Sequence, residues 1–426
     1  MAGAVVLLPW VCLLGLAPVA GGGPIFGDRP FIAVWNAPSQ QCRTKYDVAL
    51  DLGVFDVVLN HNQSFLGQEI SLFYSNTLGL YPHYDAAGRP AHGGVPQNGS
   101  LPAHLHQARA DIAAAIPEPG FRGLAVIDWE SWRPVWARNW DALELNREKS
   151  EELVRGRHPD WPPAKVAEVA QGEFEQSARA YMEQTLALGR HLRPGGFWGF
   201  YGFPDCYNAD FEGTSYTGEC PAVEQQRNEQ LRWLWDQSRA LYPSIYLPKE
   251  LRWTDKVGKF VRHRVGEAFR VQGRAGLGGL PVLPYARIQY ELTEDFLSQE
   301  DLVHTIGESA SQGAAGVVLW GSKNYSHSRE SCLALKEYVD GMLGRYIVNV
   351  TSSAHLCSRA VCSSHGRCVR QAGHPEAFLH LGPAHTRPHL HGQLAKQERA
   401  KLAQEFSCRC YAGWAGARCE QQGKAE

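Results

Sequence analysis

The sequence predicts an α/β fold in which a TIM-type (β/α) barrel is followed by a small disulfide-rich module. Short apolar runs that end in polar or aromatic residues recur through most of the chain, and helix-like stretches lie between them. Buried strands that alternate with helices are typical of a parallel sheet. About seven or eight such units favour a closed barrel over a doubly wound sheet. Cysteines crowd together near the C-terminus, and this crowding indicates the second module.

The composition excludes several classes of protein. Hydrophobic residues make up 44% of the 426 residues and charged residues 20%, so most of the chain can form a buried core. The formal net charge of −2 provides no basic field, and we therefore expect no nucleic-acid partner. Aromatic residues make up 11%, which suits either core packing or the recognition of sugars.

The two ends of the chain and its cysteines indicate the compartment. Residues 1–20 form a short apolar run ending in small residues, which predicts a signal peptide. This run is too short to cross a bilayer, and the C-terminus carries no anchor signal, so we expect no membrane anchor. Loss of Cys12 with the signal leaves an even number of cysteines, which fits an oxidising compartment. We expect a secreted and/or lysosomal monomer, glycosylated at the sequons Asn62, Asn98, Asn324 and Asn349.

The predicted elements of the barrel follow one another along residues 21–345. Strands are expected at PFIAVWNAP near Trp35, VFDVVLNHN near Val57, GLAVIDWE ending at Glu130, GGFWGFYGF around Tyr201, PSIYLP at Tyr246, PVLPYARIQY ending at Tyr290 and GAAGVVLWG around Trp320. Helices are expected at residues 163–193, 226–241, 257–271 and 298–313. Functional side chains of such barrels lie at the C-terminal ends of the strands. We therefore expect a cluster of strand-end residues: Asn36, Glu130, Tyr201, Tyr246 and Trp320.

Residues 346–426 resemble an EGF-like module, with HGRC and CRCYAGWAGARC both in place. The third loop between cysteines is too long for the standard module, so residues at about 370–405 are interpreted as an insertion. The resemblance implies the pairs Cys357–Cys368, Cys362–Cys408 and Cys410–Cys419. Cys206 and Cys220 would close a short loop, worth about 3 kcal/mol in the chain-entropy model. Cys42 and Cys332 then pair by elimination and join the start of the barrel to its end.

The insertion is rich in histidine, which raises the question of a metal site. Its histidines are His374, His380, His385, His389 and His391. His385 and His389 have the spacing of a helical ligand pair, but Pro388 between them disfavours a helix. No cysteine lies among these residues, so we expect a solvated loop, no metal and no cofactor.

Two acids, Asp128 and Glu130, flank Trp129 where the buried run GLAVID ends. On a strand, residues i and i+2 point to one face and lie roughly 6–7 Å apart. Two carboxylates this close cannot both ionise freely, so one pKa rises and a general acid becomes available. A structural acid pair at the barrel end is the alternative interpretation, and the residues alone do not decide between the two.

Several longer segments carry a resemblance. VIDWESWRPVWARNW, GFWGFYGFPDCYN, ALYPSIYLP and GAAGVVLWG resemble the signature segments of the hyaluronidase family, glycoside hydrolase family 56. The similarity runs from about Pro30 to Cys419. It implies a distorted barrel, an EGF-like module and endo-acting hydrolysis of β-1,4 N-acetylhexosaminidic bonds in hyaluronan, with chondroitin as a slower substrate. Without an anchor signal, the chain is most similar to the soluble lysosomal or plasma type.

The resemblance also implies roles for single residues. Glu130 matches the proton donor, and Asp128 matches the carboxylate that orients the substrate acetamido group. That group attacks its own anomeric carbon, so the enzyme provides no nucleophile and the configuration is retained. Tyr201 and Tyr246 match positions that hold the acetamido group. Further cleft positions are matched by Tyr74, Ser244, Arg264 and Trp320; Glu291 stands where relatives often have aspartate, and Arg133, Arg138 and Arg287 are further candidates for contacts with substrate carboxylates.

A second hypothesis is a catalytically weak protein that binds glycosaminoglycans or other cell-surface partners on an inert barrel. A similar fold does not guarantee activity. The presence of Asp128, Glu130, Tyr201 and Tyr246 favours the enzyme over this alternative.

Overall fold

The computed structural model describes residues 23–58, 60–274, 279–380 and 396–423. The predicted signal peptide, residues 1–20, lies outside this range, as do His385, His389 and His391 of the insertion. None of the helices in these ranges is both long enough and apolar enough to span a membrane.

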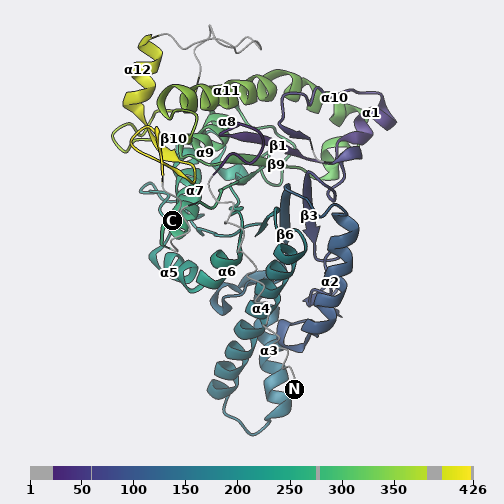
Figure 1. The fold of residues 1–426 in the computed structure, drawn as a ribbon. Coiled ribbons are helices and arrows are strands. Elements are labelled where there is room, and N and C mark those ends of the chain that lie inside the picture. The colour runs from purple at the N-terminus through teal and green to yellow at the C-terminus, as the bar shows by residue number, and fades with distance from the viewer. Residues whose placement is uncertain (1–22, 59, 275–278, 381–395, 424–426) are drawn as a thin grey trace, which may run out of the picture.

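The centre of the molecule is a distorted barrel of parallel strands that follow one another in chain order (Figure 1). Its strands are β1 (Ile32–Asn36), β2 (Val57–Val58), β3 (Ile70–Tyr74), β6 (Leu124–Asp128), β7 (Phe197–Phe200), β8 (Tyr285–Ala286) and β9 (Gly316–Trp320). They form two sheets, with strand orders β2-β1-β9-β8 and β3-β6-β7. The extended residues 241–246 connect the sheets on one side, through bridges of Tyr242 to Tyr201 and of Ser244 to Tyr285.

A side chain closes the other gap between the two sheets. Asn60, just after β2, donates to the carbonyl of Ile70 at 2.6 Å and accepts from the N–H of Glu69 at 2.9 Å. Because β2 and β3 are joined by these contacts rather than by strand pairing, the barrel is distorted at this point. Strand β3 was missed by the sequence analysis, which predicted no strand between the run near Val57 and the run GLAVIDWE.

Apolar side chains fill the barrel, as the alternation of strand residues requires. The interior cluster has buried members on every barrel strand except β7, from which the partly buried Phe197 packs against it: Ile32, Val34, Val57, Ile70, Leu72, Leu124, Val126, Ala240, Tyr242, Leu283, Tyr285, Ala315 and Val318. The intervening strand residues face outward, and Ala33, Trp35, Phe73 and Ala125 pack against the surrounding helices. This packed interior leaves the ends of the strands as the places where polar groups can gather.

Helices surround the barrel (Figure 1). The α-helices are α1 (Gln40–Tyr46), α2 (Leu101–Ala115), α3 (Glu144–Arg157), α4 (Pro163–Leu192), α5 (Ala222–Gln230), α6 (Arg232–Gln237), α7 (Val257–Arg274), α8 (Gln299–Leu302), α9 (Glu308–Ser311), α10 (Arg329–Tyr338), α11 (Gly344–Val361) and α12 (Lys396–Glu405). The π-helical turns η6 (Val303–Gly307) and η8 (Val339–Leu343) join α8 to α9 and α10 to α11. Short 3₁₀ turns are η1 (His61–Gln63), η2 (Pro96–Asn98), η3 (Trp136–Arg138), η4 (Asp141–Leu143), η5 (Lys249–Leu251) and η7 (Lys323–Ser326).

The long helix α4 confirms the helix predicted at residues 163–193. Pro163 occupies its first turn, where a missing N–H costs nothing. Its buried side chains recur at helical spacing, among them Val166, Ala170 and Phe174, so one face packs on the barrel while the other is polar. Figure 1 shows α3 and α4 projecting together beyond the sheet.

The predicted helix at residues 226–241 is confirmed as far as Gln237, apart from a break at Leu231, and is wrong over its last four residues. Helix α5 ends at Gln230 and α6 at Gln237. The N–H groups of Arg239 and Ala240 donate to the carbonyl of Trp198 on β7, so the chain continues as a barrel strand. The apolar periodicity of the sequence extends to Leu241. It does not reveal that the N–H groups of Arg239 and Ala240 form hydrogen bonds with the edge of β7 instead of continuing the helix.

The C-terminal module contains the antiparallel pairs β10 (Gly366–Arg370) with β11 (Phe406–Cys410) and β12 (Trp414–Ala415) with β13 (Gln421–Gln422). A further hairpin, β4 (His83–Tyr84) with β5 (Pro90–Ala91), lies in the barrel domain. The described residues contain five disulfides, the same pairs that the sequence analysis gave: Cys42–Cys332, Cys206–Cys220, Cys357–Cys368, Cys362–Cys408 and Cys410–Cys419. Helix α11 runs through the domain boundary proposed at residues 345 and 346 and supplies Cys357, so barrel and module share one continuous helix.

A buried ion cluster joins the module to the barrel. Glu308 on α9 is fully buried, and its carboxylate accepts from Arg262 on α7 and from Arg370 on β10. Gln312 donates to the same carboxylate at 3.0 Å. One buried negative charge therefore neutralises cations from two parts of the chain.

Replacing Glu308 with glutamine is expected to destabilise the protein by about 3–5 kcal/mol, because a buried guanidinium loses its counter-ion. Denaturant unfolding of the Glu308→Gln variant measures this loss. The control is Glu337→Gln, at an exposed position on α10. Equal unfolding midpoints for the two variants would contradict the assignment of Glu308 as the ion that joins the module to the barrel.

Candidate active site

The register of the strands brings polar side chains together at the C-terminal end of the barrel. Tyr74, the last residue of β3, pairs with Asp128, the last residue of β6. On the facing sheet, Asn36 at the end of β1 pairs with Trp320 at the end of β9. Parallel strands carry all these ends to the same edge, as the sequence analysis expected.

The acid pair is held in place by the residue between its members. Trp129 is buried behind the strand, where its ring stacks on Tyr81 at 4.6 Å and contacts Phe200 at 5.5 Å. The alternation of side chains then directs Asp128 and Glu130 to the opposite side. The side chain of Glu130 is 57% exposed, whereas Asp128 is largely buried. One acid is therefore accessible, and the other lies below the surface.

The raised pKa that the sequence predicted belongs to Asp128. The pKa of Asp128 is raised to about 7, mainly by burial and in smaller part by the negative charge of Glu130, while Arg133 acts in the opposite direction. The pair therefore holds a proton at acidic pH. One oxygen of Asp128, Oδ1, is buried without a hydrogen-bond partner within the described part of the protein.

Aromatic rings form a wall beside the acids. The rings of Tyr246 and Trp320 stack with centroids 6.1 Å apart, and Tyr201 lies 5.8 Å from Tyr246. Trp320 Nε1 donates to the hydroxyl of Tyr74 at 2.9 Å, which ties β9 to β3 across the barrel mouth. The hydroxyl of Tyr201 contacts Ser244 Oγ at 3.4 Å. The structure thus brings these five candidate residues together.

The tyrosine hydroxyls near the acids stay neutral. Burial raises the pKa of Tyr74 to about 12, with further contributions from Asp128 and Glu130. Burial also raises the pKa of Tyr201, and Glu130 adds to the effect. The pKa of Tyr246 is raised well above its usual range, mainly by burial. Neutral hydroxyls can donate hydrogen bonds to carbonyl oxygens, as the acetamido role of Tyr201 and Tyr246 would require.

Arg264 binds the protein itself. Its guanidinium donates to Asn208 Oδ1 at 2.9 Å and to the carbonyl of Ser244 at 3.0 Å, and it lies 3.6 Å from the carboxylate of Asp205. It therefore holds the segment that carries Tyr246. Arg138 is also internal, because it is buried and bonded to Glu224 at 2.9 Å; its expected contact with substrate is wrong.

Glu291 and Arg287 lie at one side of the site. Burial raises the pKa of Glu291, whereas Arg287 and Arg264 oppose the shift, and the charge of Glu130 also contributes. Glu291 is therefore within electrostatic reach of the acid pair. The guanidinium of Arg287 lies 5.5 Å from the Trp320 ring centroid and 5.9 Å from that of Tyr246, so it borders the aromatic wall. Arg133 donates to the backbone carbonyl of Glu130 at 3.2 Å and supports the acid from behind.

Two further polar residues lie below the acids: Tyr285, which the sequence analysis missed, and Asn36, which it expected in the strand-end cluster. Tyr285 on β8 is buried, contacts the ring of Tyr201 at 5.1 Å and is influenced by the charge of Asp128. The amide group of Asn36 is fully buried, and neither it nor the Tyr285 hydroxyl has a well-formed hydrogen bond within the described residues. Polar atoms of Asn36, Tyr285 and Asp128 thus form a polar floor inside an apolar barrel. For Tyr285, the available signal was a tyrosine within an otherwise apolar run.

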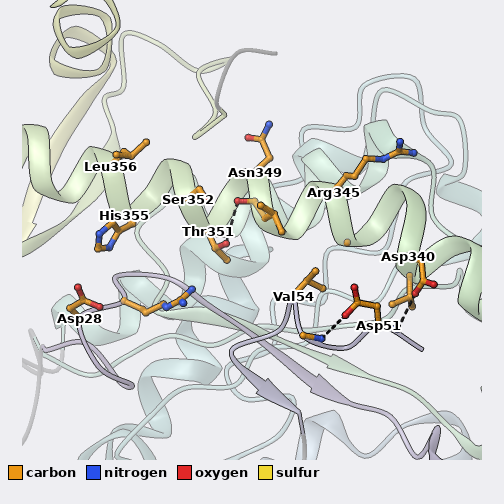
Figure 2. Close-up of a pocket in the computed structure, with 15 residues that line it drawn as sticks. Asp28, Asp51, Val54, Asp340, Arg345, Asn349, Thr351, Ser352, His355 and Leu356 are labelled. Atoms are coloured by element: carbon orange, nitrogen blue, oxygen red, sulfur yellow. Dashed lines mark hydrogen bonds between the residues drawn. The ribbon is translucent and has the colours of Figure 1, made fainter. Parts of the chain in front are cut away.

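A large cavity lies away from the acid pair (Figure 2). It has a volume of about 960 Å³ and lies between α11 and the segments around Asp28 and Asp51. These segments precede β1 and β2, so the cavity is at the N-terminal end of the strands, opposite the acids. Figure 2 shows Val54, Thr351 and His355 at this cavity. Active sites of such barrels lie at the other, C-terminal end of the strands.

The sequons and histidines are placed as follows. Asn62, Asn98 and Asn324 are exposed, and Asn349 on α11 is half-buried at the rim of the cavity in Figure 2. Of the insertion histidines, His380 is partly buried and contacts the hydroxyl of Tyr346 at 2.9 Å. Within the described ranges, no three residues among His, Cys, Asp and Glu are grouped closely enough to hold a metal ion.

Comparisons with known proteins identify the family of this chain. A family model described as Hyaluronidase matches residues 21–423. Hyaluronidase-1 from Sus scrofa is 53% identical over 98% of this chain and 99% of its own length, and Hyaluronidase-1 from Homo sapiens is 53% identical over 98% of each. The crystal structure of bee venom hyaluronidase in complex with a hyaluronic acid tetramer is similar with a TM-score of 0.67 and 33% identity, over 74% of this chain and 98% of that chain. The chain therefore belongs to the hyaluronidase family of glycosidases.

Proposed function

We propose that this protein hydrolyses β-1,4 N-acetylhexosaminidic bonds within hyaluronan, with Glu130 as the proton donor. The observation that carries this proposal is an exposed carboxyl group next to a buried one whose pKa is raised to about 7. Both lie beside an aromatic wall at the barrel end where such enzymes act. The hyaluronic acid tetramer bound by the bee venom relative supports hyaluronan as the substrate.

In this mechanism the two acids, Glu130 and Asp128, have different roles. Glu130 transfers its proton to the glycosidic oxygen as the bond from that oxygen to the anomeric carbon breaks. The acetamido oxygen of the same sugar attacks the anomeric carbon, so no carboxylate of the protein needs to reach it. Asp128 accepts the acetamido N–H, and the neutral hydroxyls of Tyr201 and Tyr246 support the acetamido group.

Water completes the reaction. Glu130, now a carboxylate, removes a proton from the water molecule that opens the cyclic intermediate. Because the carbon is attacked twice from opposite faces, the configuration is retained. The acid pair shares a proton only below about pH 7, and the reactive form carries that proton on Glu130 and leaves Asp128 charged, so we expect an acidic optimum. We also propose slower cleavage of chondroitin, a monomeric state and a secreted and/or lysosomal location; five disulfides support the location.

The test is incubation of purified protein with hyaluronan and, separately, with chondroitin from acidic to mildly alkaline pH. Electrophoretic sizing of the fragments is expected to show internal cleavage, fastest at acidic pH, with hyaluronan cut faster than chondroitin. Proton NMR of the newly formed ends is expected to show the β-anomer first. Binding without cleavage at every pH would instead favour the catalytically weak glycan-binding protein, and a first-formed α-anomer would exclude retention.

A further inference from the structure

Two large apolar side chains are unusually exposed. Trp253 is 78% exposed and Leu292 is 92% exposed, more than any other large apolar side chain within the described residues. Large apolar side chains exposed to solvent often mark a binding site when they lie close together and border a functional cleft.

The backbone at both residues is strained. Trp253 has φ +61° and Leu292 has φ +59°, in the left-handed region that bulky side chains rarely adopt. Glycine or asparagine would occupy these positions at lower cost. Strain of this kind persists where the surrounding structure enforces it, and it is found frequently at ligand-binding sites. Both loops thus hold an apolar side chain outward in a conformation that the chain does not prefer.

Both residues lie on the acid pair's face of the barrel. Trp253 follows the strand segment that carries Ser244 and Tyr246, and Leu292 follows β8 and the residue Glu291. The two loops are adjacent, because Glu291 donates its N–H to the carbonyl of Leu247 at 2.9 Å and pairs with Pro248. Loops that follow the C-terminal ends of barrel strands form the substrate face.

The surroundings of Trp253 suit an acidic sugar. The guanidinium of Arg252 lies 3.9 Å from the centroid of the Trp253 ring and is bonded to Asp295 from the neighbouring loop at 2.5 Å. Arg252 thereby fixes the indole ring and joins the two loops. A flat apolar ring can pack on the C–H face of a pyranose, and an adjacent guanidinium can attract a uronate carboxylate.

We propose that Trp253, Leu292 and Arg252 form an outlying subsite that binds sugars of the polysaccharide chain several units away from the bond that is cleaved. The ligand is an alternating acidic polysaccharide that extends from the aromatic wall across the loops after residues 241–246 and after β8. The inference rests on the proposed function, and it predicts that the protein favours long chains over short ones.

The experiment compares kcat/KM on polymeric hyaluronan with kcat/KM on the shortest oligosaccharide that the protein cleaves. The variants are Trp253→Gly and Leu292→Gly, because glycine removes the side chain and tolerates the left-handed backbone. We expect each variant to raise KM for the polymer about three- to tenfold and to leave kcat/KM for the short substrate unchanged. Trp253→Phe, which keeps a ring, is expected to restore much of the polymer affinity. Leu333→Ala on α10, another exposed apolar position, is the control.

The outcomes separate this inference from the proposed function. Cleavage of the short oligosaccharide by the unmodified protein tests the proposed function alone. Equal effects of Trp253→Gly on both substrates, or no effect on either, would overturn the subsite. A change from dimer to monomer in Trp253→Gly, measured by sedimentation, would overturn it too, because the exposed pair would then be an interface between copies of the chain.

Discussion

The Glu130→Gln variant is expected to bind hyaluronan as the unmodified protein does and to cleave it about 10²- to 10⁴-fold more slowly. The amide has the size and polarity of the acid but no proton to donate to the glycosidic oxygen. The side chain of Glu130 is 57% exposed, and its ion pair with Arg133 is long, with 3.9 Å between the guanidinium nitrogen and the carboxylate oxygen. The substitution therefore leaves the packing of the site intact. Fragment sizing measures the rate, and calorimetry measures the binding.

The chain offers a closely matched control for this variant. Glu152 on α3 is 55% exposed and forms an ion pair with Lys149 three residues away, as Glu130 does with Arg133. Glu152→Gln should therefore retain full activity. If Glu130→Gln kept its turnover, the proton would have to come from another group, and the assignment of Glu130 would fail.

The Asp128→Asn variant is expected to lower kcat about 10²- to 10³-fold. The amide cannot carry the charge that stabilises the acetamido group as its nitrogen becomes positive in the transition state. The raised pKa of Asp128 adds a second, independent expectation about stability. Its folded-state pKa of about 7 lies above the usual value of 3.8, so the folded protein binds the proton more tightly than the unfolded chain does.

The sign of the stability effect follows from this difference. The contribution of Asp128 to stability is fully present below its unfolded pKa of 3.8 and is lost as the pH rises through about 7. Above that pH, a buried carboxylate must be charged at a cost of up to about 4 kcal/mol. Asp128→Asn is therefore expected to unfold at a higher temperature than the unmodified protein at about pH 8, and at a similar temperature near pH 4.

Thermal unfolding at the two pH values measures this difference, with Asp255→Asn as the control because the side chain of Asp255 is 85% exposed. The Glu130→Gln variant supplies a further check. Removal of its charge should lower the pKa of Asp128, but only in part, because burial is the larger cause. An equal stability difference at both pH values would show that Asp128 is not buried as the structure has it.

Local patterns in the chain were sufficient for the elements that are long or strongly patterned. The run before Asp128 and the amphipathic stretch from Pro163 were predicted as a strand and a helix, because apolar burial repeats at the period of each. Strand β3 was missed since its five residues include Ser71 and are flanked by polar loops. The helix predicted through Leu241 failed because the partner that converts it to a strand, Trp198, is more than forty residues away.

The sequence by itself determined which chemical groups are available: the acids Asp128 and Glu130, the tyrosines and tryptophan at strand ends, and the cysteines that form the disulfides. Only the tertiary structure decided the environment of each group, and so how two groups of the same chemical type differ. It buried Asp128 and exposed Glu130, turned Arg264 and Arg138 inward to protein partners, and held Trp253 outward. The physical reason is that burial, charge and hydrogen bonding depend on neighbours that are distant in the chain, whereas the sequence pattern records only local periodicity.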